Sequence, residues 1–163
     1  MTFLEKHDIH QLEGGLPVMN AEQKQAYFNE VVIPNRDHAD EVTDALRKDG
    51  GTVLESAQTE RINGFTNPDY NRHWADVVST LDPLSKVVVC DGWQFSFGTL
   101  LEVRSALDRG IAVQDEHGQP VTRERAAQDV DQAMNVAAQH GVDFSKLGLV
   151  VREDDIRQGP MSL

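Results

Sequence analysis

The side chains best suited to chemistry are concentrated between residues 91 and 102. The carboxylate of Glu102 follows Gly98 by four residues, and the hydroxyl of Ser96 precedes that glycine by two. A glycine at the start of a helix lets an anion approach the free backbone N–H groups there. The helix dipole keeps a glutamate one turn further on in its ionised form, as a nucleophile requires. The pattern therefore suits an anion-binding site with a nucleophilic carboxylate beside it.

The same residues also have a purely structural interpretation. The run Thr99–Glu102 fits the S/T-x-x-E capping box, in which the glutamate only closes the start of the helix. Asp91 can bond a sugar hydroxyl or a base, or simply begin a turn. Trp93 and Phe95 can stack on a base or cover the core. The local sequence leaves these alternatives open.

A βαβ unit is the element that must position these residues. Residues 86–90 form an apolar run that predicts a buried strand, followed by a loop over 91–97, a helix over 98–109 that Gly110 ends, and a second strand over 111–113. Strands buried on both faces belong to parallel sheets, in which ligands bind beyond the carboxyl ends. The residues expected at the mouth of a site are therefore Asp91, Gly92, Trp93, Gln94, Phe95, Ser96 and Glu102.

The rest of the chain continues the alternation of strands and helices. The segment 20–34 fits a helix capped by Asn20 or a strand within 26–33 that Pro34 ends, and we favour the strand. The other expected elements are helices over 36–49, from Asn67 to Pro83 and over 122–140, strands over 52–55 and 147–151, and a polar loop over 56–66.

This alternation predicts an α/β fold. We expect a three-layer sandwich in which helices flank a parallel, Rossmann-like or flavodoxin-like sheet of about four or five strands. The predicted organisation is an N-terminal extension over 1–20, a single α/β domain over 21–152 and a C-terminal tail over 153–163.

Composition narrows the range of functions. The net charge of −12 disfavours nucleic-acid polymers and anionic membranes as partners. No apolar run reaches the roughly 20 residues of a membrane span, and no signal-peptide pattern is present. The single cysteine, Cys90, suits a reducing cytoplasm. The six histidines form no metal-spaced helix pair, and the dinucleotide, Walker and serine-hydrolase motifs are missing, so no metal or cofactor is expected.

The segment from Cys90 to Val113 resembles the active-site segment of the nucleoside 2-deoxyribosyltransferase-like superfamily, in particular its small phage and bacterial members of unassigned function. The resemblance is carried by Gly92-Trp93, by Ser96-x-Gly98, by the glutamate four residues after that glycine and by Gly110-Ile-x-Val113. It implies a nucleoside or nucleoside 5′-monophosphate N-glycosidase or deoxyribosyltransferase. It also implies a homo-oligomer.

The resemblance further implies roles for individual residues. Glu102 would attack the anomeric carbon in a retaining two-step reaction, and Ser96 would contact the sugar or its 5′-phosphate. Asp76 would assist the leaving base, with Asp69 and Asp82 as rivals, and Tyr27 on the first strand would help at the site. Residues 29–36 lack the glycines of the family's first loop. The alternatives are therefore a non-catalytic nucleotide-binding module or an acidic protein-interaction module on the same fold.

Overall fold

A computed structural model describes residues 3–9, 17–56 and 67–141 of the chain. The chain divides into two compact units, one of residues 1–60 with 139–143 and the other of residues 61–138 with 144–163. Helices make up 64% of the described residues. None of the described helices combines the length and the apolar character that crossing a bilayer demands.

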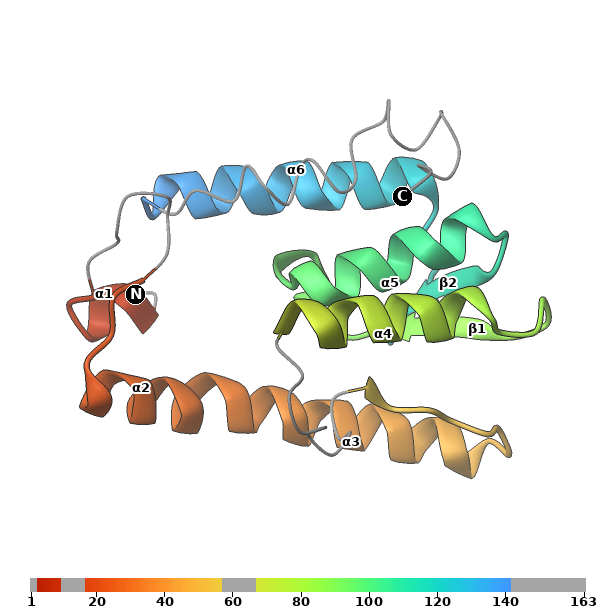
Figure 1. The fold of residues 1–163 in the computed structure, drawn as a ribbon, viewed down its shortest axis with the longest axis horizontal. Coiled ribbons are helices and arrows are strands. Elements are labelled where there is room, and N and C mark those ends of the chain that lie inside the picture. Colours follow the sequence, from red (N-terminus) through yellow and green to blue (C-terminus); the bar gives the residue numbers. More distant parts are fainter. Residues whose placement is uncertain (1–2, 10–16, 57–66, 142–163) are drawn as a thin grey trace. The chain divides into compact units, whose positions relative to one another are not determined.

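The first unit is built on one long helical rod (Figure 1). After the short helix α1 (Phe3–Lys6), the rod consists of α2 (Ala21–Tyr27), the π-helical turn η1 (Phe28–Val32) and α3 (Ile33–Lys48). Asn20 opens it with a capping box: its side chain accepts from the Gln23 N–H at 2.8 Å, and its own N–H donates to the Gln23 side chain at 3.0 Å.

The strand expected within residues 26–33 is therefore wrong, and the alternative of a helix capped by Asn20 is confirmed. Proline normally breaks a helix because its ring clashes with the carbonyl four residues earlier. Here the π-helical turn directly precedes Pro34, and the Ile33 N–H donates to the Phe28 carbonyl. The wider turn lets the rod continue through the proline.

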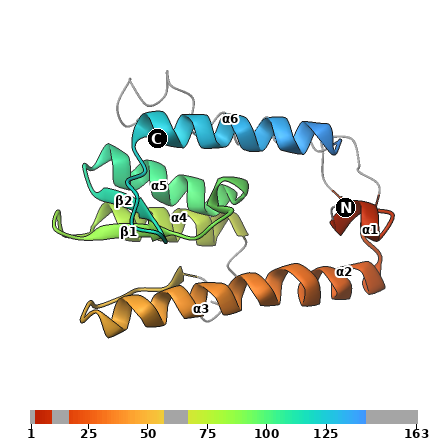
Figure 2. The ribbon, with the colours of Figure 1, turned by 180° about the vertical axis from the view of Figure 1, so that it is seen from behind.

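The second unit contains the predicted βαβ unit, which is confirmed. Strand β1 (Lys86–Val89) leads through the 3-10 turn η3 (Trp93–Phe95) into α5 (Phe97–Asp108), and α5 leads into β2 (Ala112–Asp115). The two strands lie side by side and pair in parallel (Figure 2), with Lys86 opposite Ala112 and Val89 opposite Asp115. Gly110 turns the chain between α5 and β2 at a φ of 71°, which a glycine adopts without strain.

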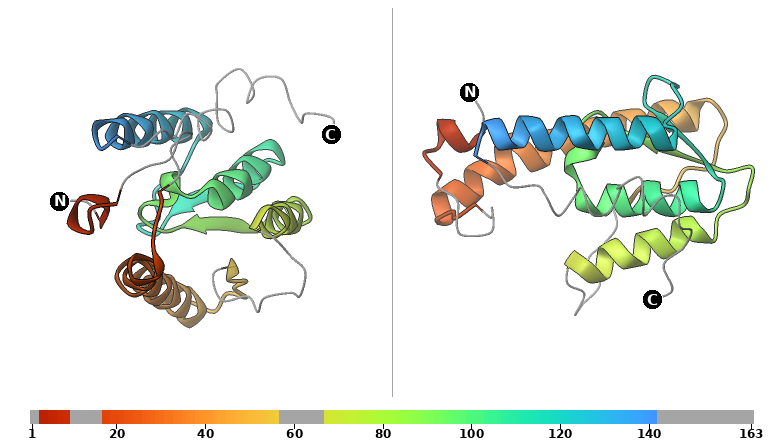
Figure 3. Two further views of the ribbon diagram at one scale, coloured as in Figure 1. Left: turned by 60° about the vertical axis from the view of Figure 1, so that its left-hand side comes forward. Right: turned by 90° about the horizontal axis from the view of Figure 1, so that it is seen from above.

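Two further helices complete this unit. Helix α4 (Asn67–Ser79) begins at the predicted residue and packs along α5 (Figure 3). Helix α6 (Arg123–Gln139) begins after Thr122, whose hydroxyl accepts from the Arg125 N–H at 3.2 Å, as expected of a cap. The core joins both strands to three helices through the buried side chains of Val78, Val89, Trp93, Leu100, Val103, Ala106, Ile111, Val113, Val121, Ala126 and Val130.

The predicted three-layer sandwich with a sheet of about four or five strands is wrong. The described residues form a two-stranded sheet and are mostly helical. Residues 26–33 are helical because Asn20 caps a run of good helix formers, which outweighs the β-branched residues at its end. Residues 52–55 pair with no described strand, and Leu54 is exposed. The strand expected over 147–151 and all but Ser56 of the loop expected over 56–66 lie outside the described residues.

Candidate ligand-binding site at the carboxyl ends of the strands

The parallel pairing of β1 and β2 brings two short loops together at one edge of the sheet. Residues 26 apart in sequence are partners throughout the ladder. The same offset continues past the strand ends, since Asp91 lies beside His117, with 3.3 Å between Asp91 Oδ2 and His117 Nε2. The Asp91 N–H also donates to Glu116 Oε2 at 2.8 Å. These contacts place the loop after β1 against the turn after β2.

The loop after β1 turns sharply at Gly92, whose φ of 85° lies in the left-handed region. The Trp93 N–H then donates to the Cys90 carbonyl at 3.1 Å, and the indole is only 6% exposed. Of the two roles open to Trp93, covering the core is therefore the one that the structure supports. Phe95 stays 42% exposed.

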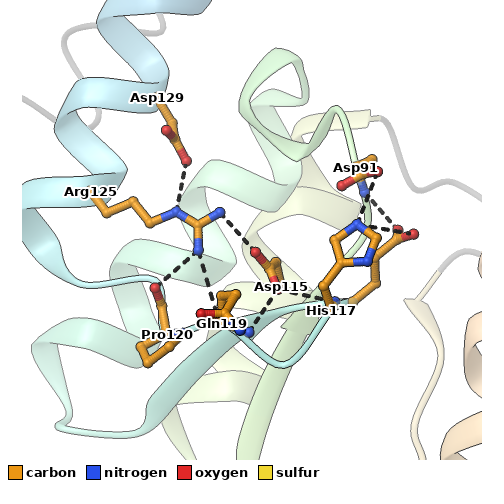
Figure 4. A network of polar contacts seen from close by, with 8 residues as sticks. Asp91, Asp115, His117, Gln119, Pro120, Arg125 and Asp129 are labelled. Carbon is orange, nitrogen blue, oxygen red and sulfur yellow. Dashed lines mark hydrogen bonds and ion pairs between the residues drawn. The ribbon is translucent and has the colours of Figure 1, made fainter.

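The side chain of Asp115, the last residue of β2, accepts the hydrogen bonds that hold the following turn. Its Oδ1 accepts from the backbone N–H groups of Gln119 at 2.8 Å and His117 at 3.0 Å. Its Oδ2 accepts from Arg125 Nη2 at 2.8 Å (Figure 4). These donors, the Gln119 N–H first, hold the pKa of Asp115 below its ordinary value although burial opposes them. Asp115 is therefore a buried but ionised carboxylate.

Arg125 reaches this turn from the first turns of α6 (Figure 4). Besides Asp115, its guanidinium lies 3.4 Å from Asp129 Oδ2 and donates to the Pro120 carbonyl at 3.0 Å. The bond to Asp115 is the main reason why the pKa of Arg125 lies above its ordinary value. The positive charge of Arg125 is thus held between two carboxylates.

A cavity of about 300 Å³ opens between the two loops and α6. It is lined by Asp91, Gly92, Trp93, Gln94, Asp115, Arg125 and Asp129. Three carboxylates therefore face one guanidinium, which two of them already contact. Such a lining offers acceptors to hydroxyl or amino groups and repels a phosphate.

The predicted nucleophile, Glu102, does not line this cavity. It lies on a stripe of α5 with Gly98, Ser105 and Arg109, at spacings of four, three and four residues that place all of them on one helix face. That face meets α4: Ser105 Oγ donates to the Ala75 carbonyl at 2.9 Å, and Arg109 Nε donates to the Ser79 carbonyl at 3.1 Å.

The other end of the stripe is equally close to α4. A Cβ at Gly98 would lie 2.6 Å from Asn71 Oδ1, so Gly98 serves the contact between the helices, and it lines no part of the cavity. Glu102, between these contacts, is half-buried. Burial raises the pKa of its carboxyl to about 7, and among the described residues no charged neighbour contributes to that rise.

Ser96 caps α5 and is absent from the cavity lining. Its Oγ accepts from the Thr99 N–H at 3.3 Å and from Thr99 Oγ1 at 3.0 Å. The capping box proposed for Thr99 and Glu102 is therefore wrong, because the cap lies one turn earlier. Of the residues expected at the mouth of the site, Asp91, Gly92, Trp93 and Gln94 line the cavity, whereas Phe95, Ser96 and Glu102 do not.

The remaining predicted catalytic residues lie elsewhere. Asp76 is exposed on α4, and its rival Asp82 accepts from the Leu84 N–H at 2.8 Å in the turn before β1. Tyr27 was expected on a strand but ends α2 in the first unit, where its ring packs edge-on against Phe3 with centroids 5.4 Å apart. No described contact joins any of them to the cavity.

Sequence reasoning missed the half of the site that follows β2. The sequence pattern predicts a helix over 122–140 but assigns no role to Asp115, Arg125 or Asp129. The register of a parallel pair is the signal that could have found Asp115, since it places the ends of both strands at one edge of the sheet. Comparisons with protein-family models, curated proteins and solved structures found no match for this chain.

Proposed function

We propose that this protein binds a small, hydroxyl-rich molecule of the nucleoside class in the cavity at the carboxyl ends of β1 and β2. The observation that carries this proposal is the lining of three carboxylates around one guanidinium already held by Asp115 and Asp129. Carboxylates accept hydrogen bonds from sugar hydroxyls and base amino groups. The cavity is at the small end of the range for small-molecule sites.

The charge of the cavity selects among the ligands that the family resemblance implies. A 5′-phosphate needs an available cation or free backbone N–H groups. The guanidinium of Arg125 is engaged, and the N–H groups of His117 and Gln119 donate to Asp115. The net charge of the whole chain, −12, adds to the repulsion. We therefore expect unphosphorylated nucleosides to bind in preference to their 5′-monophosphates.

Isothermal titration calorimetry on chelator-treated protein tests this proposal. Deoxynucleosides and their 5′-monophosphates are titrated into the wild type and into Asp91→Asn, which removes one exposed charge from the lining. Asp131→Asn, an exposed aspartate of α6 outside the cavity, is the matched control. We expect nucleosides to bind at least about tenfold more tightly than monophosphates, and Asp91→Asn alone to lose about tenfold, equivalent to 1.4 kcal/mol.

Tighter binding of monophosphates would contradict the proposal, as would equal binding by Asp91→Asn and Asp131→Asn. Absence of binding by every nucleoside would overturn it as well.

A second candidate function, cleavage or transfer of the N-glycosidic bond through Glu102, is favoured by a different observation. The carboxyl of Glu102 is half-buried with a pKa of about 7, so both its protonation states are populated at neutral pH. As a nucleophile it must be ionised, and kcat/KM should then rise with pH through about 7. Asp76, on the helix that packs along α5, keeps the role at the leaving base that the resemblance implies.

Chromatographic detection of released base separates this second function from binding alone. Glu102→Gln should abolish release, whereas Glu124→Gln, a change at an exposed glutamate of α6, should leave it unchanged. Ligand binding without base release would reject catalysis and retain the binding proposal. Release that persists in Glu102→Gln would exclude Glu102 as the nucleophile.

A further inference from the structure

We infer that Asp91, Glu116 and His117 form a binding site for one divalent transition-metal ion at the edge of the sheet. Each residue contributes one ligand atom, and these atoms all lie within 4.8 Å of one another. The inference goes beyond the proposed function, because it needs no nucleoside and rests on residues two of which do not line the cavity.

The separations between the donor atoms fit a shared ion. Ligand atoms about 2.1 Å from a zinc ion lie about 3.4 Å apart in a tetrahedral arrangement. His117 Nε2 is 3.3 Å from Asp91 Oδ2 and 3.9 Å from Glu116 Oε1. Figure 4 shows the imidazole of His117 directed toward Asp91. Small side-chain rotations therefore suffice to bring all three atoms to bonding distance.

The surrounding structure holds the donors in place. Glu116 has a side chain only 9% exposed, and its Oε2 accepts from the Asp91 N–H at 2.8 Å, so its position is fixed from both loops. Asp115 Oδ1 accepts from the His117 N–H at 3.0 Å and fixes the backbone that carries the imidazole. Supporting hydrogen bonds of this kind orient the ligands of metal sites.

The donor set indicates which ion is favoured. One imidazole nitrogen with two carboxylates suits Zn²⁺ or Mn²⁺, whereas Mg²⁺ and Ca²⁺ prefer oxygen ligands alone. The side chains of Asp91 and His117 are 70% and 63% exposed, so an ion held here keeps open positions toward solvent. Three protein ligands with an open position are the arrangement found in catalytic zinc sites.

The pairing that builds this site explains why the sequence predicted no metal. Asp91 and His117 are 26 residues apart, a separation that no helix or short motif joins. Because β1 and β2 are parallel with that same offset, the sheet brings the two residues together. The spacing of histidines along the chain cannot reveal a site of this kind.

Calorimetric titration of chelator-treated protein with ZnCl₂ and MnCl₂, in the absence of any nucleoside, tests the inference. We expect one ion per chain and a loss of at least about tenfold in affinity in His117→Ala and in Asp91→Asn. The control is His38→Ala, because His38 is also a histidine beside a glutamate, with its side chain 43% exposed and Nδ1 3.9 Å from Glu41 Oε2. This variant should bind as the wild type does.

Three results would overturn the metal site: no binding of either ion up to millimolar concentration, binding that survives both His117→Ala and Asp91→Asn, or equal losses in His117→Ala and His38→Ala. Circular dichroism of each variant confirms that the fold is intact. His117→Gln serves as a second variant of the same ligand if His117→Ala fails to fold. Since no nucleoside is present, a negative result here leaves the proposed function standing, and a positive one does not depend on it.

Discussion

Asp115 and Glu102 are both carboxyl groups that the second unit largely covers, yet their pKa values move in opposite directions. Asp115 accepts two backbone hydrogen bonds and contacts a guanidinium, which together favour its ionised form. Glu102 lies on the face of α5 that meets α4, and among the described residues burial is the influence that raises its pKa. The comparison shows that burial raises the pKa of Glu102, whereas the donors around Asp115 outweigh the same effect.

The two regions are accordingly suited to different tasks. The turn around Asp115 carries carboxylates that can accept hydrogen bonds from a ligand or coordinate an ion. The face of α5 around Glu102 holds a proton that is exchanged near neutral pH. Each of the following substitutions changes one side of this comparison.

Asp115→Ala should have the largest effect on stability. It leaves the N–H groups of Gln119 and His117 and the guanidinium of Arg125 without their common acceptor. We expect the thermal midpoint at pH 7 to fall by several degrees, and far more than in Asp91→Ala, whose side chain is exposed. Equal midpoints for the two variants would show that Asp115 is not the centre of this turn.

The pH dependence of the same group has a defined sign. Because the pKa of Asp115 is lower in the folded state than its ordinary value of 3.8, its contribution to stability is fully present above that pH. The contribution is lost as the pH falls through the lower, folded-state pKa. Below pH 3.8, the free energy of unfolding of Asp115→Asn should therefore depend less steeply on pH than that of the wild type.

Glu102→Gln should stabilise the protein at high pH. A carboxyl whose pKa is raised from 4.5 to about 7 binds more protons in the folded state, so wild-type stability falls as the pH rises between these values. The neutral amide avoids this loss, which amounts to at most about 3 kcal/mol at pH 8. Urea unfolding at pH 8 and at pH 4.5 measures it, with the exposed-site variant Glu124→Gln as control. A gain of equal size at both pH values would contradict this explanation.

Gly98→Ala should have a smaller effect than Glu102→Gln and should lower the free energy of unfolding by about 1 kcal/mol. The added Cβ would meet Asn71 Oδ1 at 2.6 Å, and the gain in helix propensity from replacing glycine offsets part of that clash. In an Asn71→Ala background the same change should become stabilising. A double-mutant cycle by urea unfolding measures the difference, and additive effects would show that the two residues are not in contact.

His117→Ala should have the smallest effect on the metal-free protein. Its imidazole is 63% exposed and its contact with Asp91 is a surface pair, so the free energy of unfolding should change by less than about 1 kcal/mol. Urea unfolding in the presence of a chelator checks this expectation. A larger loss would assign His117 a structural role instead of a ligand role.

Local patterns predicted the elements that local interactions decide. The strand from Lys86, the helix that follows it and the stop at Gly110 follow from apolar runs and a glycine, and all of them are confirmed, although Ser96 and not Thr99 caps the helix. The rod through Pro34 was missed because a single π-helical turn relieves the clash that normally ends a helix at proline. No residue pattern in that segment predicts such a turn.

The site was half predicted for a related reason. Asp91, Gly92 and Trp93 directly follow a recognisable strand, so the rule for parallel sheets located them. Asp115, His117 and Arg125 join the site through the register of β1 and β2 and through a bond from α6, both of which are long-range in sequence. Conversely, Glu102 has the right spacing from Gly98 for the family's nucleophile but lies on the face that packs against α4.

Carbon-13 NMR titration of the side-chain carboxyl groups tests the central comparison most directly, with signals assigned from Glu102→Gln and Asp115→Asn. We expect the carboxyl of Glu102 to titrate near pH 7, and that of Asp115 to remain ionised until the pH falls below 3.8. Titration of Glu102 at its ordinary value of 4.5 would contradict the claim that burial raises the pKa of its carboxyl.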